Sequence, residues 1–143
     1  MKKIFIDTNI FIRFLVDDNH KMRNETKKLF EYIKGGVVKA ETDVIVLVEI
    51  IWVLSSFYRV KKDKIFEYLT LLLNLKNLVV KEEKIIVNAL NIYLKNNVDF
   101  IDAFIASYGI NKKIKYIYSY DKDYDKIFKD IKGISRIEPK NLT

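Results

Sequence analysis

The sequence predicts an α/β fold in which a parallel sheet is covered by helices on both faces. Short apolar segments alternate with amphipathic segments of ten or more residues, a pattern typical of parallel strands joined by helical crossovers. The chain has one proline and four glycines, and no linker or low-complexity segment divides it. We therefore expect residues 1–143 to form a single domain around one core.

In the first half of the chain, apolar spacing and capping residues predict the elements. The first apolar run ends at Asp7, from which a helix begins, and Gly35 and Gly36 end the second helix. Thr42 or Asp43 can cap the third helix. The expected elements are strand 3–6, helix 9–16, helix 21–34, strand 37–41, helix 44–58 and helix 62–75.

In the second half, one helix is predicted by apolar residues at helical spacing, including Ile86, Leu90 and Tyr93. Asp99 or a neighbour begins the next helix. The expected elements are strand 78–80, helix 83–95, helix 99–110, strand 116–119 and a fifth strand over 135–137.

The composition excludes several kinds of site. The chain has no cysteine and a single histidine, His20, which rules out disulfide frameworks, Cys-ligated metals and thiol catalysis and leaves carboxylate chemistry. The 26 Lys and Arg residues against 19 Asp and Glu residues give a net charge of +7, which favours a polyanionic partner such as nucleic acid. No apolar run approaches the roughly 20 residues of a membrane span, and the apolar start is too interrupted for a signal peptide, so we expect a cytoplasmic protein.

Two acids in the first half occupy positions that suggest chemistry. Asp7 directly follows the first strand, at the edge where parallel sheets bind ligands, although capping of the next helix is an alternative role. Glu49 is the only charged residue in the apolar segment 44–54. A carboxylate buried in such a helix needs a metal ion or a distant cation as a partner.

Further acids lie in the second half. Asp99 and Asp102 are three residues apart, which places both on one face in the first turn of the predicted helix. Capping explains Asp99 but not Asp102, whose apolar neighbours suggest burial. Asp121 directly follows the fourth strand, whereas Asp123 and Asp125 are interpreted as solvated loop acids.

Carboxylates from separate segments are thus expected to converge at one edge of the sheet. Clustered carboxylates repel one another and require a cation, and oxygen ligands without His or Cys favour Mg²⁺ or Mn²⁺. In a basic protein, this combination predicts cleavage of a phosphodiester, because the metal activates water and neutralises charge on the phosphate.

Four segments resemble, in the same order, the PIN-domain family, and within it the VapC-type toxin ribonucleases. They are residues 6–9 (Ile-Asp-Thr-Asn), Glu49 in its apolar helix, residues 99–103 (Asp-Phe-Ile-Asp-Ala) and residues 119–124 (Ser-Tyr-Asp-Lys-Asp-Tyr). The resemblance implies a three-layer α/β/α sandwich with a four- to five-stranded parallel sheet. It also implies that Asp7, Glu49, Asp102 and Asp121 form the acidic quartet of the active site, with Asp99 as an additional acid for the metal.

Supporting polar positions are implied for Thr8, Asn9 and Ser119. Ser119 stands where the family more often has threonine, and Tyr124 where it usually has phenylalanine. The Asn9 amide is also able to hold a carboxylate in place by donating a hydrogen bond.

The function implied by the resemblance is cleavage of single-stranded RNA by an endoribonuclease that uses Mg²⁺ or Mn²⁺. Asp7, Asp102 and Asp121 would hold one or two ions, Glu49 would bind metal or position the attacking water, and Arg13 is a candidate for contacting the RNA backbone. Cleavage would leave a 5′-phosphate and a 3′-hydroxyl. Members are typically homodimers, and the toxins are blocked by a small antitoxin protein.

Two other functions are compatible with the same residues. One is a PIN-like RNA- or protein-binding module without catalysis, and the other is a PIN nuclease of RNA processing that has no antitoxin. Haloacid-dehalogenase-like phosphatases need Asp-x-Asp after the first strand, and here the third residue is Asn9. Among the remaining conspicuous residues, Asp17 and Asp18 are interpreted as a loop pair at a helix end. The large aromatic residues are expected in the core, namely Trp52, Phe57, Phe66 and Phe104.

Overall fold

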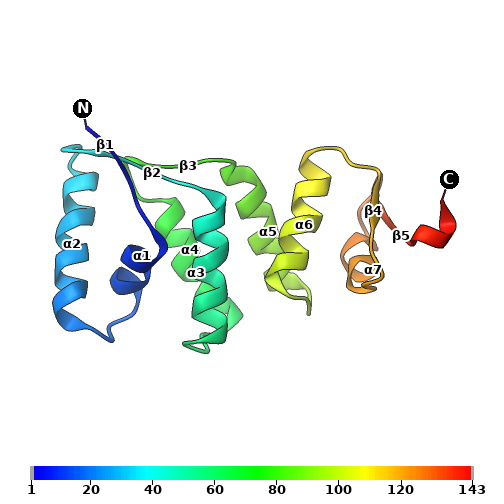
Figure 1. The fold of residues 1–143 in the computed structure, drawn as a ribbon, viewed down its shortest axis with the longest axis horizontal. Helices are drawn as coiled ribbons and strands as arrows, with labels where there is room; N and C mark the ends of the chain where they lie inside the picture. Colours follow the sequence, from blue (N-terminus) through cyan, green and yellow to red (C-terminus); the bar gives the residue numbers. More distant parts are fainter. Residues whose placement is uncertain (1, 143) are drawn as a thin grey trace. The chain divides into compact units, whose positions relative to one another are not determined.

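Parallel strands and α-helices alternate along residues 2–142, the residues that the computed structural model describes (Figure 1). The strands are β1 (Lys3–Phe5), β2 (Lys39–Thr42), β3 (Leu78–Val80), β4 (Tyr116–Tyr118) and β5 (Ser135–Ile137). The helices are α1 (Thr8–Leu15), α2 (His20–Lys34), α3 (Val44–Ser56), α4 (Lys62–Leu73), α5 (Glu83–Lys95), α6 (Phe100–Asn111) and α7 (Asp123–Phe128), followed by a short 3₁₀ turn over Pro139–Asn141. The predicted α/β class is confirmed, and every predicted strand is present. The chain divides into two compact units, the first ending at Glu83 and the second starting at Lys84.

The first unit contains a three-stranded parallel sheet in the order β1-β2-β3. Ala40 and Thr42 on β2 are buried, whereas Lys3 and Glu41 form a 2.9 Å ion pair on the opposite face. Figure 1 shows α1 to α4 extending from one side of this sheet. The buried Thr42 hydroxyl donates to the Ile6 carbonyl at 3.0 Å, which fixes the end of β1 where Asp7 follows.

The helix α3 forms the centre of the first unit because almost all of its residues are apolar. Leu47, Ile50 and Leu54 are completely buried, so burial of apolar surface holds α3 in place. The Asp43 carboxylate accepts a 2.6 Å hydrogen bond from the Val44 N–H and begins the helix.

The second unit packs α5, α6 and α7 with a two-stranded parallel sheet of β4 and β5. The buried Ser107 hydroxyl on α6 donates to the Ile85 carbonyl on α5 at 2.7 Å. On the other side of α6, a side chain at Gly109 would lie 2.9 to 3.0 Å from Ile134 and Ile117. The glycine therefore allows α6 to approach β4 and β5 closely.

Three details differ from the sequence prediction. In place of the expected four- to five-stranded sheet, the structure contains a three-stranded sheet and a two-stranded sheet, both parallel. The helix α7 was not predicted, because its six residues are too short for periodicity to show, although Tyr124, Ile127 and Phe128 bury one face of it. Trp52 and Phe57 are 61% and 73% exposed, so their expected place in the core is wrong.

Within residues 2–142, no helix is both long enough and apolar enough to cross a membrane.

Candidate metal centre and candidate active site

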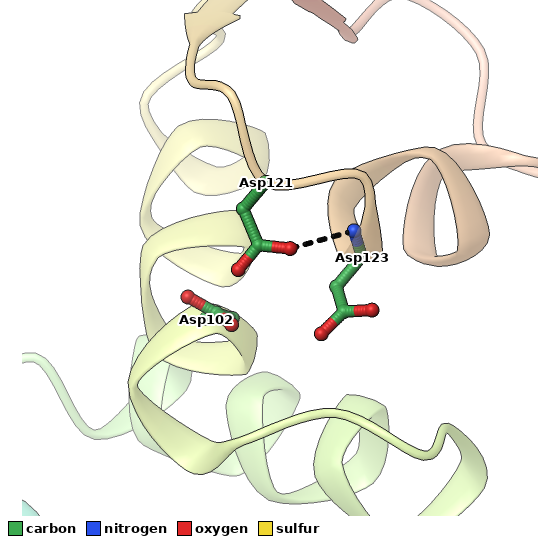
Figure 2. Close-up of side chains that lie close together, drawn as sticks. All are labelled: Asp102, Asp121 and Asp123. Carbon is green, nitrogen blue, oxygen red and sulfur yellow. Dashed lines mark hydrogen bonds between the residues drawn. The ribbon is translucent and has the colours of Figure 1, made fainter.

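Three carboxylates gather in the second unit. Asp102 lies in the first turn of α6, Asp121 follows β4, and Asp123 is the first residue of α7. One oxygen of each lies within 4.8 Å of the other two, and Figure 2 shows the three carboxylates around a common space. Two of these acids, Asp102 and Asp123, are half-buried. We call these three residues the acidic cluster.

Two hydrogen bonds hold the loop that carries this cluster. The Asp121 N–H donates to Ser119 Oγ at 2.9 Å, and the Asp123 N–H donates to Asp121 Oδ1 at 2.9 Å (Figure 2). The second bond satisfies a backbone donor at the start of α7, which would otherwise lack a helical partner. The Asp121 side chain is therefore held by the same turn that begins α7.

Arg136 on β5 ties this loop to the sheet. Its Nη1 donates to the Ser119 carbonyl at 2.9 Å and to Glu138 at 2.8 Å, and its Nε donates to Asp125 at 3.1 Å. Only 11% of the Arg136 side chain is exposed. Asp125, interpreted above as a solvated loop acid, is exposed but takes part in this network.

Tyr124 contacts the Asp102 carboxylate of the cluster. Its ring is buried, and its hydroxyl donates to Asp102 Oδ1 at 3.3 Å. Burial, together with the negative charge of Asp102, raises the pKa of the Tyr124 hydroxyl far above its usual value. The hydroxyl thus stays protonated and remains a donor to the carboxylate.

The electrostatics of the cluster are unfavourable without a cation. Burial raises the pKa of the Asp102 carboxyl, and the negative charges of Asp121 and Asp99 raise it further, against the lowering effect of the Tyr124 hydrogen bond. A divalent cation would reverse this effect by stabilising the charged form of Asp102.

A pocket in the first unit contains the other two acids of the predicted quartet. It has a volume of about 270 Å³ and is lined by Asp7, Glu49, Arg13 and Tyr58, among others. The Asp7 carboxylate accepts a 2.7 Å hydrogen bond from the Thr8 N–H and so caps α1. This is the alternative role that the sequence predicted for Asp7. Its capping role leaves lone pairs for another ligand.

Glu49 does not occupy the environment that the sequence suggested. It is exposed on α3, because the helix turns this position away from the buried side formed by Leu47, Ile50 and Leu54. Because Glu49 is exposed, its carboxylate does not require a metal ion or a distant cation as a partner. Its link to a candidate site is that it lines the same pocket as Asp7.

The supporting polar positions next to Asp7 differ in their surroundings. Asn9 is exposed and lines the pocket. Thr8 is buried, and its hydroxyl oxygen has no hydrogen-bond partner within the part of the chain that the structure describes.

The structure places Asp99 and Asp123 differently from the sequence prediction, in which Asp99 was an additional acid for the metal and Asp123 a solvated loop acid. Asp99 is the exposed N-cap residue of α6 and lies outside the group of three close carboxylates, although its charge contributes to the raised pKa of Asp102. Asp123 joins the group. The Asp-x-Asp spacing after β4 was the available signal, but it gives no indication that a helix begins at Asp123.

A sequence model of the PIN domain matches residues 4–130. The chain belongs to the PIN-domain family. No curated protein matches it. Among solved structures, it is similar to VapBC2 from Rickettsia felis, determined bound to a DNA fragment from its promoter, with 17% identity, coverage of 96% of this chain and 98% of that chain, and a TM-score of 0.36.

PIN domains are generally nucleases and generally use divalent metal ions. The donor set of this PIN domain fits such an ion. The acidic cluster offers only carboxylate oxygens, which Mg²⁺ and Mn²⁺ prefer, and the raised pKa of Asp102 reflects a negative charge that a cation would compensate. Asp102, Asp121 and Asp123 are the residues that would hold it.

The predicted quartet is present in this PIN domain as two pairs. Asp102 and Asp121 lie together in the second unit, where Asp123 joins them. Asp7 and Glu49 line one pocket of the first unit.

Proposed function

We propose that this PIN domain is a metal-dependent endoribonuclease that cleaves single-stranded RNA, and that it is the toxin of a toxin–antitoxin pair. The observation that carries the proposal is the acidic cluster, in which oxygens of Asp102, Asp121 and Asp123 lie within 4.8 Å of one another. Membership of a nuclease family and the net charge of +7 support a polyanionic substrate.

In the proposed reaction, a water oxygen attacks the phosphorus, the P–O3′ bond breaks, and the 3′ oxygen takes up a proton. The products are a 5′-phosphate and a 3′-hydroxyl. When bound, one or two Mg²⁺ or Mn²⁺ ions would lower the pKa of the attacking water and neutralise charge at the phosphate. Asp102 and Asp121 would hold the metal, and Asp123 would add a carboxylate that the sequence prediction left out. Asp7 and Glu49 would contact the substrate from their shared pocket, with Glu49 positioning the attacking water.

Residues around the four main acids have secondary roles in this proposal. Ser119 holds the loop of Asp121 through its 2.9 Å hydrogen bond. Asn9 lines the pocket beside Asp7 and is able to orient a carboxylate through its amide. Thr8 offers a buried hydroxyl next to Asp7, and Asp99 contributes negative charge near Asp102. The whole chain, residues 1–143, acts as one nuclease domain.

The proposed partners are RNA as substrate, a second copy of the chain in a homodimer, and a small antitoxin that blocks the site, all in the cytoplasm. The antitoxin and the homodimer come from the resemblance to VapC-type toxins. A small open reading frame next to the gene, encoding a protein that co-purifies with this chain and inhibits it, is the expected finding for a toxin. A processing nuclease would cleave RNA without such an inhibitor.

The proposal is tested by incubating the full chain with a labelled single-stranded RNA in Mn²⁺ and in EDTA. We expect cleavage only with Mn²⁺, and a loss of at least about 100-fold in Asp102→Asn and Asp121→Asn, because each change removes a metal ligand. Asp130→Asn is the matched control, since Asp130 is an exposed acid of the same unit that lies outside the cluster.

The main alternative, a binding module without catalysis, predicts a different result. Such a module would bind RNA without cutting it, and Mn²⁺ would leave its melting temperature unchanged. Cleavage that persists in EDTA, or that survives in Asp102→Asn, would contradict the proposed metal-dependent reaction.

A further inference from the structure

Two pockets of the first unit meet at the same two residues of α1, Asn9 and Arg13. The first pocket contains Asp7 and Glu49, and the second extends over α2 to Met22. Their volumes are about 270 and 280 Å³, many times the roughly 10–15 Å³ that a cavity needs to hold one water. Both are therefore able to receive part of a ligand, with Arg13 at the boundary between them.

Arg13 is held at this boundary by residues from two other segments. Its Nη1 donates to Asp18 Oδ1 at 2.8 Å, and the Tyr58 hydroxyl donates to Asp18 Oδ2 at 2.6 Å. The Arg13 side chain remains 34% exposed. Within residues 2–142, Nη1 is the guanidinium nitrogen with a hydrogen bond, so the remaining N–H groups are available to a ligand.

We infer that Arg13 binds a backbone phosphate of the RNA strand, and that Asp18 and Tyr58 are positioning residues that aim its guanidinium. The choice of RNA rests on the proposed function. Among the described residues lining the two pockets, Arg13 is the only cation, and it stands beside the acids of the first pocket. A planar guanidinium matches two oxygens of a phosphate.

The position of Arg13 also predicts how the RNA strand lies across the two pockets. A phosphate bound at Arg13 lies between the two pockets, so the nucleotide on one side enters the pocket of Asp7 and Glu49. The neighbouring nucleotide enters the second pocket, where Met22 offers an apolar surface and Glu25 an acceptor for base N–H groups. This second pocket is thus the one that would distinguish bases.

A structural role is the competing explanation, because the contacts of Asp18 also fasten the α1–α2 connection to the end of α3. The chain contains a matched arginine that separates the two explanations. Arg23 pairs with Asp17 at 3.6 Å and its side chain is 30% exposed, but it lines neither pocket. Arg13→Gln and Arg23→Gln therefore each remove one positive charge and one contact to an aspartate of the α1–α2 connection. Only Arg13→Gln also removes a guanidinium from the pockets.

The experiment measures binding of a fluorescent single-stranded RNA to the full chain in the Asp121→Asn background, in Mg²⁺, over a series of KCl concentrations. We expect Arg13→Gln to weaken binding roughly tenfold and to reduce the slope of log affinity against log salt by about 0.7, the loss of one phosphate contact on a single strand. Arg23→Gln should leave both near their starting values. Arg13→Lys should retain the slope.

Asp18→Asn and Tyr58→Phe should weaken binding less than Arg13→Gln and leave the salt slope unchanged, because the guanidinium is still present. Melting curves identify any variant that is unfolded, and Arg13→Lys then carries the comparison. Equal effects of Arg13→Gln and Arg23→Gln on affinity and slope would overturn the inference, as would a chain that does not bind RNA. If the unaltered chain binds RNA through Arg13 but does not cleave it with Mn²⁺, the proposed reaction fails and the phosphate site stands.

Discussion

The two acidic regions of this PIN domain are built differently. In the second unit, three carboxylates lie within 4.8 Å of one another, and a half-buried member, Asp102, has a raised pKa. In the first unit, Asp7 and Glu49 are exposed, and Arg13 lines the same pocket. Crowded, half-buried carboxylates need a cation, whereas solvent screens exposed ones. The difference favours metal binding by the second unit and substrate contact by the first.

The largest expected effect tests this division directly. Asp102→Asn and Asp121→Asn should lower Mn²⁺ affinity at least about 100-fold, while Asp7→Asn should keep most of the affinity and still lose cleavage. Calorimetric titration of the full chain with Mn²⁺ measures the affinities. Equal losses of Mn²⁺ affinity in Asp7→Asn and Asp121→Asn would break the division between the units.

The next effect concerns the network that holds the acidic cluster. Arg136→Met removes the hydrogen bonds to Ser119, Asp125 and Glu138, so we expect Mn²⁺ affinity to fall about tenfold, as for other groups that orient metal ligands, and the melting temperature to drop. Lys132→Met, which removes an exposed charge from the same unit, should change neither. Titration calorimetry and melting curves of both variants decide the point, and a normal Mn²⁺ affinity in Arg136→Met would contradict a positioning role.

A smaller effect is expected from pH. Burial and the charge of Asp121 raise the pKa of Asp102 in the folded chain, so the folded state holds this proton more tightly than the unfolded state. The resulting stabilisation is complete below the usual carboxyl pKa of about 3.9 and is lost as pH rises through the higher folded pKa. Without metal, the melting temperature of the unaltered chain should therefore fall relative to Asp102→Asn over this range.

Melting curves of both chains between about pH 3.5 and 7 in EDTA test the pH prediction. Saturating Mn²⁺ should reverse this trend, because the ion stabilises the charged carboxylate of the unaltered chain, whereas Asp102→Asn binds the ion weakly. A difference between the two chains that does not change with pH would show that Asp102 has an ordinary pKa.

The smallest effect is expected for Tyr124→Phe. The change removes the 3.3 Å hydrogen bond to Asp102 but keeps the ring in its buried position, so we expect a loss of about 0.5–1.5 kcal/mol in the free energy of unfolding above the pKa of Asp102. The pKa of Asp102 should rise further, since the tyrosine favours its charged form. Chemical denaturation at two pH values measures the loss, and an equal loss at both would contradict the role assigned to the hydroxyl.

The order of strands and helices was predictable because it depends on local periodicity. The apolar run before Asp7 and the spacing of Ile86, Leu90 and Tyr93 carry that information within a few residues. Side-chain exposure depends on which face of a helix meets the core. The exposure of Glu49 and Trp52 was therefore missed in a helix that is apolar on nearly every side.

Part of the candidate site was predictable from single residues, Asp102 because capping did not explain it and Asp121 because it follows a strand. Asp102 and Asp121 were identified, and the structure places them together. Asp123 was missed because a turn, not a sequence period, brings it to Asp121. Arg136 was missed because its hydrogen bond to the Ser119 carbonyl exists only once β4 and β5 pair.

The central claim is that Asp102, Asp121 and Asp123 hold the divalent ion of the nuclease. The most direct test is a crystal of the full chain grown with Mn²⁺ and measured for anomalous scattering. We predict a peak bound by oxygens of these three residues that disappears in Asp121→Asn crystals. A peak bound by other residues alone, or crystals in saturating Mn²⁺ with no peak at the cluster, would contradict the claim.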